Sequence, residues 1–398
     1  MKKILIISCV FPPEPVVSAQ LSVDIAEGLS KNNVVTVLSP KPTRPLNFKF
    51  NSHFERMDFK HIVVDSYTCP ESKFLGRLRE SYSFGKACQK YILKNHKNID
   101  IIYQNSWPLF SQRYIIKAAK KFGIPVLTHV QDIYPESLLN KLPAAKTIFK
   151  NLLLPIDKHN LEYSKKVLCI SENMKNTLME SRKLPESKFE IVVNWQNEEN
   201  FINYHTSKKD QQSQHDEIFT LMYLGNNGPV AGVDFLIETF VKANLKNARL
   251  IIAGSGSKTE DCKKLAKQLN AKNIEFIPVP EGKVPEIQDI ADVMLLPVKK
   301  NSAYSSIPSK LPAYMFSKKP IIGSLDLDSD TAKAIVNANA GIVVEPENEE
   351  KLMEAMQQLS KWDKGKLLQN GENGFNYAME HLSKKINLNK VVQVIIDT

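Results

Sequence analysis

Short apolar runs alternate with longer amphipathic stretches along most of the chain. A short apolar run bounded by polar or turn residues is typical of a buried strand, and the stretches between show helical spacing. This alternation predicts a parallel, doubly wound sheet with helices on both faces. In the first half, strands are expected at Lys3–Val10, Val34–Leu38, Lys60–Val64, Ile99–Gln104, Pro125–His129, Lys166–Ile170 and Phe189–Val193, and helices at Ser18–Ser30, Ser83–Asn95 and Gln112–Phe122.

The alternation begins again after a polar stretch. Residues 200–217 lack apolar periodicity and are expected to form a linker. The stretch from Glu349 to Ile396 is expected to be helical. Between them, a second series of strands is expected at Phe219–Gly225, Ala248–Ala253, Asn273–Pro278, Asp292–Pro297, Pro320–Gly323 and Gly341–Glu345.

Length and composition fit two globular domains. The chain has 398 residues, of which 42% are hydrophobic and 24% charged. No apolar run approaches the roughly 20 residues of a membrane-spanning helix. The N-terminal run resembles a signal peptide, but it ends in Pro12-Pro13 without a small-residue cleavage site, so a buried first strand is predicted. The five scattered cysteines indicate inert thiols in a reducing cytoplasm.

The positive charge is concentrated in the first half. Residues 1–196 hold 29 Lys and Arg against 17 Asp and Glu, a net charge of +12, whereas the remainder carries −2. An anionic membrane surface, an anionic acceptor or nucleic acid would each explain the excess. Residues 141–166 interleave lysines with apolar residues, which predicts a helix on anionic lipid; an ordinary core helix with solvated lysines is the alternative. Nucleic acid is disfavoured because no binding motif accompanies the charge.

The most informative stretch runs from Ala291 to Glu345. A strand ends in Pro297, a polar loop follows, and a helix opens near Pro308-Ser309-Lys310 before the next strand. The loop and the helix start should lie at the carboxyl edge of a parallel sheet, where free backbone N–H groups and the Lys310 cation favour a phosphate. The alternative is an ordinary βαβ unit with a chance lysine.

This order of elements resembles the donor-binding half of a family 4 glycosyltransferase of the GT-B fold. The subgroup that it resembles assembles bacterial surface polysaccharides (O-antigen, capsule or colanic acid) and includes N-acetyl-L-fucosaminyltransferase-like enzymes. The resemblance implies two Rossmann-like, doubly wound α/β domains with a deep interdomain cleft. It places an acceptor-binding domain at residues 1–199, a linker at 200–217, a nucleotide-sugar-binding domain at 218–375, and at 376–398 a helix returning to the first domain.

The resemblance implies a donor site in the second domain. Two glutamates that many members carry eight residues apart are Ser305 and Ala313 here, and what replaces them is open; Asp328 and Asp330 are candidates for a ribose-binding carboxylate. The donor-binding residues that it implies are Gly225, Asn226, Asn227 and Gly228 facing the diphosphate, Gly254 and Gly256 near the nucleotide, Val279 beside the base, and Pro308, Ser309 and Lys310.

In the first domain, the segment Thr128–Glu136 resembles the His-Val-Gln-Asp segment of polysaccharide-assembly relatives. The resemblance implies that His129 or Asp132 contacts donor or acceptor hydroxyls in catalysis. The third catalytic candidate, Lys310, would stabilise the negative charge that develops on the donor diphosphate. A buried histidine and a helix-capping aspartate are the alternative. Three further residues are expected at the acceptor or the cleft: Ser18, which is also a plausible N-cap, Gln131, and Asn194, which would brace the hinge or reach the donor.

The activity implied is retaining transfer of a sugar, such as an N-acetylated amino or deoxy sugar, from a nucleotide diphosphate, most often UDP. The implied acceptor is an undecaprenyl-diphosphate-linked saccharide, used by a cytoplasmic protein held peripherally at the inner membrane face. No protein nucleophile is evident, which fits front-face attack assisted by the leaving phosphate. No cofactor or metal is expected, because Asp326-Leu327-Asp328 is an isolated match to a metal motif of another fold.

Two other classes of function stay open. A sugar-nucleotide epimerase on the same fold would need acid and base carboxylates and histidines in its cleft. A non-catalytic GT-B-like partner in an assembly complex is motivated by Ser305 and Ala313.

Overall fold

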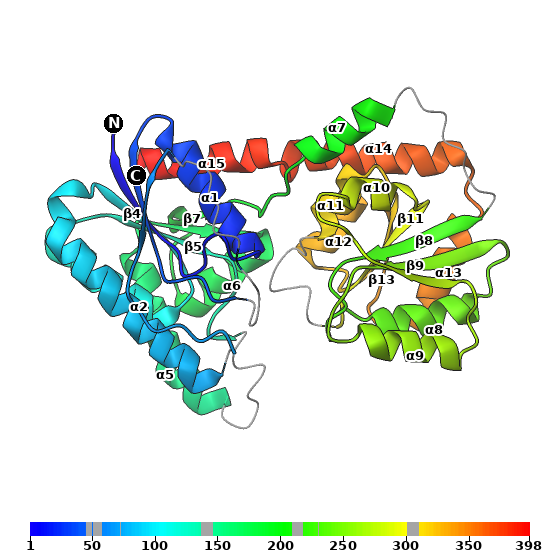
Figure 1. The fold of residues 1–398 in the computed structure, drawn as a ribbon, viewed down its shortest axis with the longest axis horizontal. Coiled ribbons are helices and arrows are strands. Elements are labelled where there is room, and N and C mark those ends of the chain that lie inside the picture. The colour runs from blue at the N-terminus through cyan, green and yellow to red at the C-terminus, as the bar shows by residue number, and fades with distance from the viewer. Residues whose placement is uncertain are drawn as a thin grey trace. The chain divides into compact units, whose positions relative to one another are not determined.

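The computed structural model describes residues 1–44, 50, 58–71, 73–136, 146–208, 218–229, 231–300 and 310–398, without the side chains of Phe74 and residues 146–150. The chain divides into two compact units (Figure 1). The first comprises Met1–Val193 and Asn387–Thr398, and the second comprises Asn194–Ile386. Each is a parallel α/β domain, as the alternating sequence pattern predicts.

The first unit contains a sheet with strand order β3-β2-β1-β4-β5-β6-β7 and parallel pairing throughout. β1 lies between β2 and β4, so the strand order changes direction at the β1/β4 pair. Open α/β sheets bind ligands at the carboxyl ends of strands at such a point. The strands are β1 (Lys3–Ile7), β2 (Val34–Ser39), β3 (Lys60–Val63), β4 (Ile101–Asn105), β5 (Val126–Val130), β6 (Lys166–Cys169) and β7 (Phe189–Ile191).

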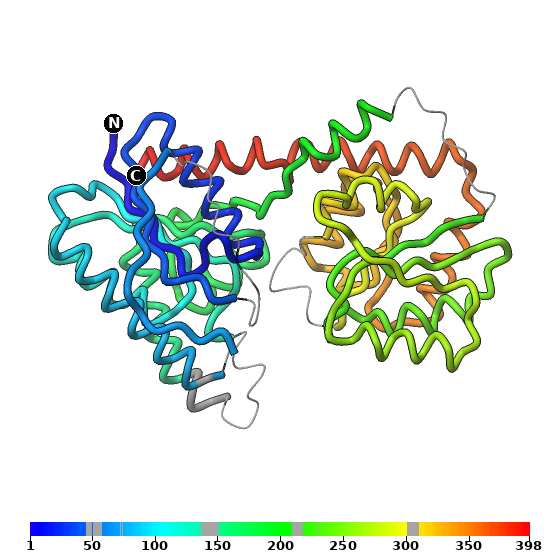
Figure 2. The backbone as a smooth tube through the Cα atoms, in the orientation of Figure 1, coloured from blue at the N-terminus to red at the C-terminus, as the bar shows by residue number. Residues whose placement is uncertain are grey.

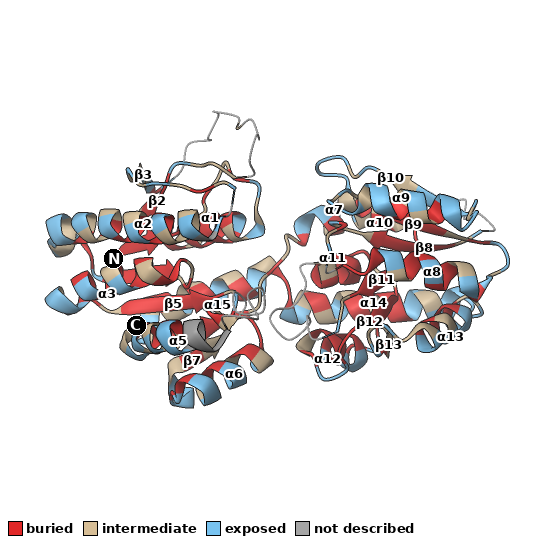
Figure 3. Cartoon of the chain, turned by 90° about the horizontal axis from the view of Figure 1, so that it is seen from below, coloured by how far each residue is buried: buried red, intermediate tan, exposed pale blue. Residues whose placement is uncertain are grey.

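Helices cover both faces of this sheet and turn their apolar sides toward it (Figure 3). The central strands β1, β4, β5 and β6 are almost wholly buried, the edge strands β3 and β7 are partly exposed, and the outer helix faces are exposed. The helices are α1 (Val17–Ser30), α2 (Phe74–Asn95), α3 (Leu109–Phe122), α5 (Lys146–Tyr163) and α6 (Glu172–Arg182).

The second unit repeats this plan with strand order β10-β9-β8-β11-β12-β13, also parallel. Its direction change falls at the β8/β11 pair. The strands are β8 (Phe219–Leu224), β9 (Ala248–Ala253), β10 (Ile274–Ile277), β11 (Val293–Pro297), β12 (Ile321–Ser324) and β13 (Gly341–Val344). The helices are α7 (Glu199–Lys208), α8 (Val233–Ala243), α9 (Thr259–Gln268), α10 (Val284–Asp289), α11 (Lys310–Phe316), α12 (Asp330–Asn337), α13 (Glu349–Leu359) and α14 (Lys364–His381).

The C-terminal helix α15 (Lys384–Asp397) brings the end of the chain back to the first unit, so both termini belong to that unit (Figure 2). Asn387 accepts a hydrogen bond from the Val193 backbone N–H at 3.2 Å, and Val391 and Ile395 are fully buried. The chain belongs to the first unit from Asn387 onward, within the range 376–398 where the resemblance places a returning helix.

The linker expected over residues 200–217 is wrong as far as Lys208, because α7 occupies that stretch. Phe201 is buried and packs on Phe316 with ring centroids 5.8 Å apart, while Tyr204 donates a hydrogen bond to Asp289. These contacts hold α7 to the second unit, although its sequence has little amphipathic pattern. Residues 209–217 lie outside the described residues.

Every helix in the described ranges is too short or too polar to cross a bilayer. All five cysteines are buried free thiols, and burial raises the pKa of Cys9 and Cys88 far above that of an ordinary thiol. The first apolar run of the chain is the buried strand β1, as expected.

Candidate functional site

The candidate site of the second unit lies at the carboxyl edge of β8, where the strand order changes direction. The loop after β8 (Gly225–Gly228), the loop after β9 (Gly254–Gly256) and the start of α11 meet there. The structure therefore brings together six of the expected donor residues and Lys310. These parts are distant in sequence, and parallel pairing places them at one edge.

Backbone hydrogen bonds lock the two loops to each other. The N–H of Gly225 donates to the carbonyl of Ala253 at 3.0 Å, and the N–H of Asn227 donates to the carbonyl of Ser255 at 3.1 Å. Tyr223, whose side chain is fully buried, donates its hydroxyl hydrogen to the carbonyl of Asn226 at 2.8 Å. The loop conformation is thus set by the protein itself before any ligand binds.

Two glycines of the expected donor set are required by this packing of loop on loop. Gly254 has φ of +110°, and a Cβ there would lie 2.4 Å from the carbonyl oxygen of Gly225. A Cβ at Gly256 would lie 2.4 Å from the side-chain oxygen of Asn226. By contrast, the nearest described atom to a Cβ at Gly228 would be 3.9 Å away, in the Asn226 side chain. The sequence interpretation explained Gly254 and Gly256 by close approach of a nucleotide, whereas the structure already requires them without one.

Lys310 is the central charged group at this edge. Its side chain is half-buried, with the ammonium 5.4 Å from the ring centroid of Tyr223. It forms no ion pair with any residue of the described ranges, and burial lowers its pKa below the ordinary lysine value. A cation desolvated without a partner is costly, and an anion bound beside it would remove that cost. The arrangement therefore suits a phosphate.

Tyr314, one turn after Lys310 on α11, fixes the helix against β8. Its hydroxyl donates to the carbonyl of Leu224 at 2.8 Å and accepts from the Leu224 N–H at 3.0 Å. Tyr314 is fully buried, so both hydrogen bonds form away from water. The sequence analysis did not identify Tyr223 and Tyr314 as part of the site. The available signal was a tyrosine in an otherwise apolar strand or helix, because a buried tyrosine hydroxyl usually has a hydrogen-bond partner.

Gly225 leaves the space that the Lys310 side chain occupies. A Cβ at Gly225 would lie 2.1 Å from Cε of Lys310, and no other described side chain approaches that closely. The glycine is therefore matched to the lysine, which the sequence does not indicate because 85 positions separate them.

The remaining donor-side residues are less informative. Val279 is half-buried just after β10, at the same edge. Ala313 is buried on α11. Asp328 is exposed and Asp330 begins α12, where it faces Lys333 at 3.9 Å. Pro308, Ser309 and Ser305 lie outside the described residues.

In the first unit, His129 is fully buried at the end of β5. Its Nδ1 lies 2.6 Å from the hydroxyl of Tyr103, which is also fully buried. Burial lowers the pKa of His129 to about 4, so the imidazole is neutral at neutral pH. This environment favours the alternative interpretation, a packed core histidine, over direct contact with substrate.

Asp132 is exposed and Gln131 half-buried, directly after β5. Arg182 holds the segment that follows. Its guanidinium donates to the carbonyl of Tyr134 at 3.0 Å, to Glu136 at 2.9 Å and to Asp157 at 2.8 Å. Arg182 is fully buried, so this cluster is a positioning device beneath the Asp132 loop.

Ser18 is not the N-cap of α1. The helix begins at Val17 with Val16 as N-cap, because a turn closed by the Val16 N–H and the Glu14 carbonyl starts it earlier. Ser18 is half-buried within the first turn, and its carbonyl accepts from the Ser22 hydroxyl. Asn194 follows β7 at the boundary of the two units, and its Oδ1 is buried without a hydrogen bond from a described residue.

A buried ionic cluster at the carboxyl edge of the first sheet was not anticipated. Glu14 accepts hydrogen bonds from the N–H groups of Thr43 and Arg44 at 2.7 and 3.0 Å. The Arg44 guanidinium bonds to Glu80, which is fully buried, and lies 5.1 Å from the Trp107 ring centroid. The cluster ties the loop after β2 to the loop after β1. Its members share no sequence motif, so spacing alone could not reveal it.

Among the described residues, no group of three His, Cys, Asp or Glu side chains is placed to hold a metal ion. The ammonium of Lys310 supplies a cation at the candidate site.

Comparison with known proteins assigns domains to both units. Residues 19–199 match the model described as Glycosyltransferase Family 4, and residues 218–361 match the model described as Glycosyl transferases group 1. One curated relative is the putative colanic acid biosynthesis glycosyl transferase WcaI of Escherichia coli strain K12, 24% identical over 201 residues. That match covers 48% of this chain and 49% of the relative, so it spans about half the relative's length.

Solved structures show the fold. Sucrose-phosphate synthase from Thermosynechococcus elongatus aligns with a TM-score of 0.74 at 14% identity, covering 99% of this chain and 98% of that one. HepE from Anabaena, solved in complex with UDP, aligns with a TM-score of 0.72 at 14% identity over the whole of both chains. Both units therefore have the Rossmann-like architecture of GT-B proteins.

Gly254 and Gly225 should respond differently to substitution by alanine. In Gly254→Ala the new Cβ meets backbone at a positive φ, so we expect the free energy of unfolding to fall by at least about 1 kcal/mol. In Gly225→Ala it meets the far end of a flexible side chain, so stability should change little while the Lys310 ammonium moves. Urea denaturation and the rate of reductive methylation of Lys310, followed by mass spectrometry, would measure both.

Gly228→Ala is the matched control, because its new Cβ has room. It should leave both stability and labelling rate as in the parent protein. If Gly225→Ala labels Lys310 at the parent rate, the glycine does not hold the lysine in place.

Proposed function

Because the chain carries a Glycosyltransferase Family 4 domain followed by a Glycosyl transferases group 1 domain on the GT-B fold, we propose that it moves a sugar from a nucleotide diphosphate to a saccharide acceptor. The domain matches and the curated relative support transferase activity. The donor is a UDP-sugar in this proposal, for which the UDP complex of the structurally similar HepE gives support.

The observation that carries the proposal is the half-buried ammonium of Lys310 at the β8/β11 edge, which forms no ion pair with a described residue. Negative charge develops on the diphosphate as the bond to the sugar breaks. A cation already held in place by the Tyr314–Leu224 hydrogen bonds stabilises that charge without reorganising. Retention of configuration follows if the acceptor attacks from the side that the phosphate leaves, with the phosphate taking the proton.

The acceptor in this proposal is a saccharide linked to undecaprenyl diphosphate in bacterial surface-polysaccharide synthesis. The curated relative acts in colanic acid biosynthesis by its description, and the net charge of +12 in residues 1–196 suits an anionic acceptor. The transferred sugar would be an N-acetylated amino or deoxy sugar, as in the N-acetyl-L-fucosaminyltransferase-like subgroup.

A second candidate is a non-catalytic partner that binds the donor without turnover. It is favoured by Ala313, which is buried on α11 at a position where the family resemblance implies a glutamate. An epimerase is less well supported, because His129 is buried and neutral at physiological pH and supplies no acid or base at the surface.

The proposal is tested by screening UDP-, GDP- and dTDP-sugars by thermal shift, then measuring nucleotide release with a lipid-diphosphate acceptor. Lys310→Ala should weaken donor binding or turnover roughly tenfold or more, because a charged hydrogen bond to phosphate contributes about 1.5–3 kcal/mol. Its fold should stay intact. Donor binding without nucleotide release in the parent protein would instead support the non-catalytic partner.

A double-mutant cycle sharpens this test. Gly225→Ala should also weaken donor binding, whereas Gly228→Ala should stay within about twofold of the parent protein. In the Lys310→Ala background, Gly225→Ala should add little, since the group that it displaces is already gone. Unchanged donor affinity and rate in Lys310→Ala would remove this lysine from the site.

We expect transfer to proceed without a divalent metal, because Lys310 occupies the electrostatic role that a metal would take. Activity measured after treatment with EDTA should match the untreated rate. Loss of transfer in EDTA that Mn²⁺ restores would overturn this expectation and bring Asp326 and Asp328 forward as ligands.

We also propose that the first unit binds anionic membranes through residues 141–166. In this range Lys141 lies outside the described residues, Leu152 is 59% exposed, and Lys158 and Lys166 are each paired with a glutamate. Replacing Lys146 and Lys150 with glutamate should lower sedimentation with anionic vesicles, and the binding of the parent protein should fall as salt rises. A parent protein that ignores anionic vesicles at low salt would contradict the proposal.

A further inference from the structure

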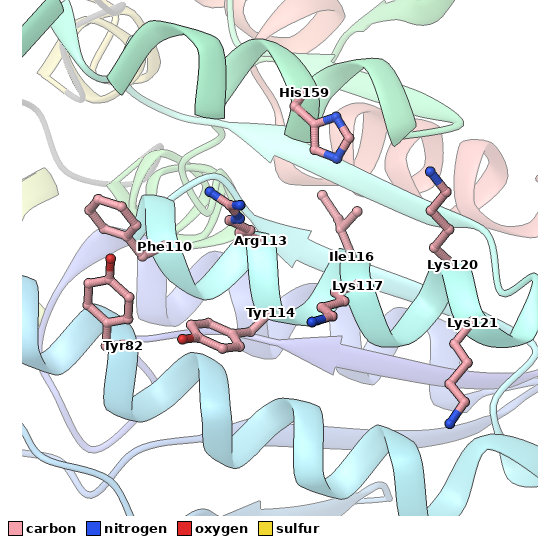
Figure 4. A pocket seen from close by; sticks show the side chains of 9 residues that line it. All are labelled: Tyr82, Phe110, Arg113, Tyr114, Ile116, Lys117, Lys120, Lys121 and His159. Carbon is pink, nitrogen blue, oxygen red and sulfur yellow. The ribbon is translucent and has the colours of Figure 1, made fainter. Parts of the chain in front are cut away.

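The outer face of α3 forms the floor of an open groove within the first unit (Figure 4). α2 borders it on one side and α5 on the other, and the hollow measures about 690 Å³. That volume lies within the range of small-molecule sites, about 300–1,000 Å³. We call it the α3 groove; its main groups are Tyr82 of α2 and Phe110, Arg113, Lys117, Lys120 and Lys121 of α3.

Four cations line the α3 groove, and no acidic side chain of the described residues pairs with them. Arg113, Lys117, Lys120 and Lys121 are exposed on one helix face and span about 12 Å at 1.5 Å per residue. No Asp or Glu is among the described groove residues. Elsewhere in this unit, lysines such as Lys166 pair with glutamates. The uncompensated charge points to an anionic occupant.

Aromatic rings line the same groove. The rings of Tyr82 and Phe110 stack with centroids 4.7 Å apart at 17°, and Tyr114 meets Tyr82 edge-on at 6.0 Å. Tyr82 remains 37% exposed, so part of the stacked pair is open to solvent. A flat apolar surface of this kind suits the C–H face of a sugar ring.

The order of these groups follows from the topology. α3 begins just after β4 ends, so Phe110 lies near the carboxyl edge of the first sheet. Lys120 and Lys121 lie in the last turn, toward the opposite edge. An extended ligand that starts at the ligand-binding edge of the sheet and runs along α3 would therefore contact the aromatic rings first and the cations next.

We propose that the α3 groove binds the non-reacting part of an acidic oligosaccharide acceptor, one that carries carboxylate, sulfate or phosphate groups. Sugar rings lie against Tyr82 and Phe110, and the anionic groups meet the α3 cations. The role as acceptor rests on the proposed transferase function, whereas binding of the acidic saccharide does not. The groove would thus select acceptors by charge at a distance from the transfer step.

Calorimetric titration of the full chain tests this with two probes, a galacturonate hexamer and a heparin-derived hexasaccharide, with maltohexaose as the neutral control. We expect at least one acidic probe to bind, binding to weaken as salt rises, and the neutral hexamer not to bind detectably. Lys117→Glu with Lys121→Glu should weaken acidic binding about tenfold or more. Tyr82→Ala should weaken it about three- to tenfold, and Tyr82→Phe should retain it.

Lys90→Glu with Lys94→Glu is the matched control. Both residues are exposed on α2, lie one turn apart and do not line the groove. Both double variants change the net charge by the same amount. In each, the second substituted residue lies in the last turn of its helix. Binding within about twofold of the parent protein would show that contact in the groove, rather than net charge, holds the saccharide.

Three results would overturn the inference. The first is failure of both acidic probes to bind the parent protein, and the second is equal losses of binding in the two double variants. The third is binding of the parent protein to anionic vesicles that Lys117→Glu with Lys121→Glu abolishes, when neither acidic probe binds the parent protein; the α3 cations would then contact a lipid surface. Donor binding and nucleotide release, measured separately, distinguish the two proposals. If acidic probes bind but no transfer occurs, the proposed function fails and the groove stands; if a neutral acceptor is used and no acidic probe binds, only the groove fails.

Discussion

The hydroxyl of Tyr314 is the contact on which the candidate site depends. It both donates to and accepts from the backbone of Leu224, at the end of β8, in a fully buried position. A buried hydroxyl with both of its roles satisfied allows little movement, because losing either bond would leave a polar group unpaired away from water. α11 is therefore held at a set distance from β8, and Lys310, one turn before Tyr314, is held with it.

The rest of the site adapts to that fixed helix. Lys310 lies where Gly225 has no side chain, and the Gly225 carbonyl in turn lies where Gly254 has none. Each residue in this series occupies space that its neighbour leaves free. The close packing at the edge leaves the Lys310 ammonium without an ion-pair partner among the residues that the structure describes. Desolvating that ammonium costs free energy, and an anionic ligand bound at this position would offset the cost.

Buried and exposed cations of the first unit differ in their partners. Arg182 and Arg44 are buried or nearly so, and each is bonded to carboxylates, which offsets the cost of removing a charge from water. These pairs hold loops in place at the carboxyl edge. The α3 cations are exposed and form no ion pair with a described residue, so their desolvation cost is small and they remain available to a ligand. The same residue types thus serve structure in one place and recognition in the other.

The sequence by itself determined the two series of parallel strands. The apolar runs predicted at Lys166–Ile170 and Ala248–Ala253, for example, are the strands β6 and β9, because burying a strand on both faces requires a continuous apolar run. It also indicated Lys310 and the glycines of the β8 and β9 loops as members of one edge, since strand order in such folds is regular.

Only the tertiary structure decided which contacts these elements and side chains make. α7 is a helix because Phe201 and Tyr204 find partners on the second unit, which no local pattern reveals. His129 is neutral because the packing of β4 against β5 buries it beside Tyr103. The match of Gly225 to Lys310 and the α3 groove depend on distances between elements far apart in sequence. Local periodicity reports which face of an element is buried, and it carries no record of what lies opposite that face.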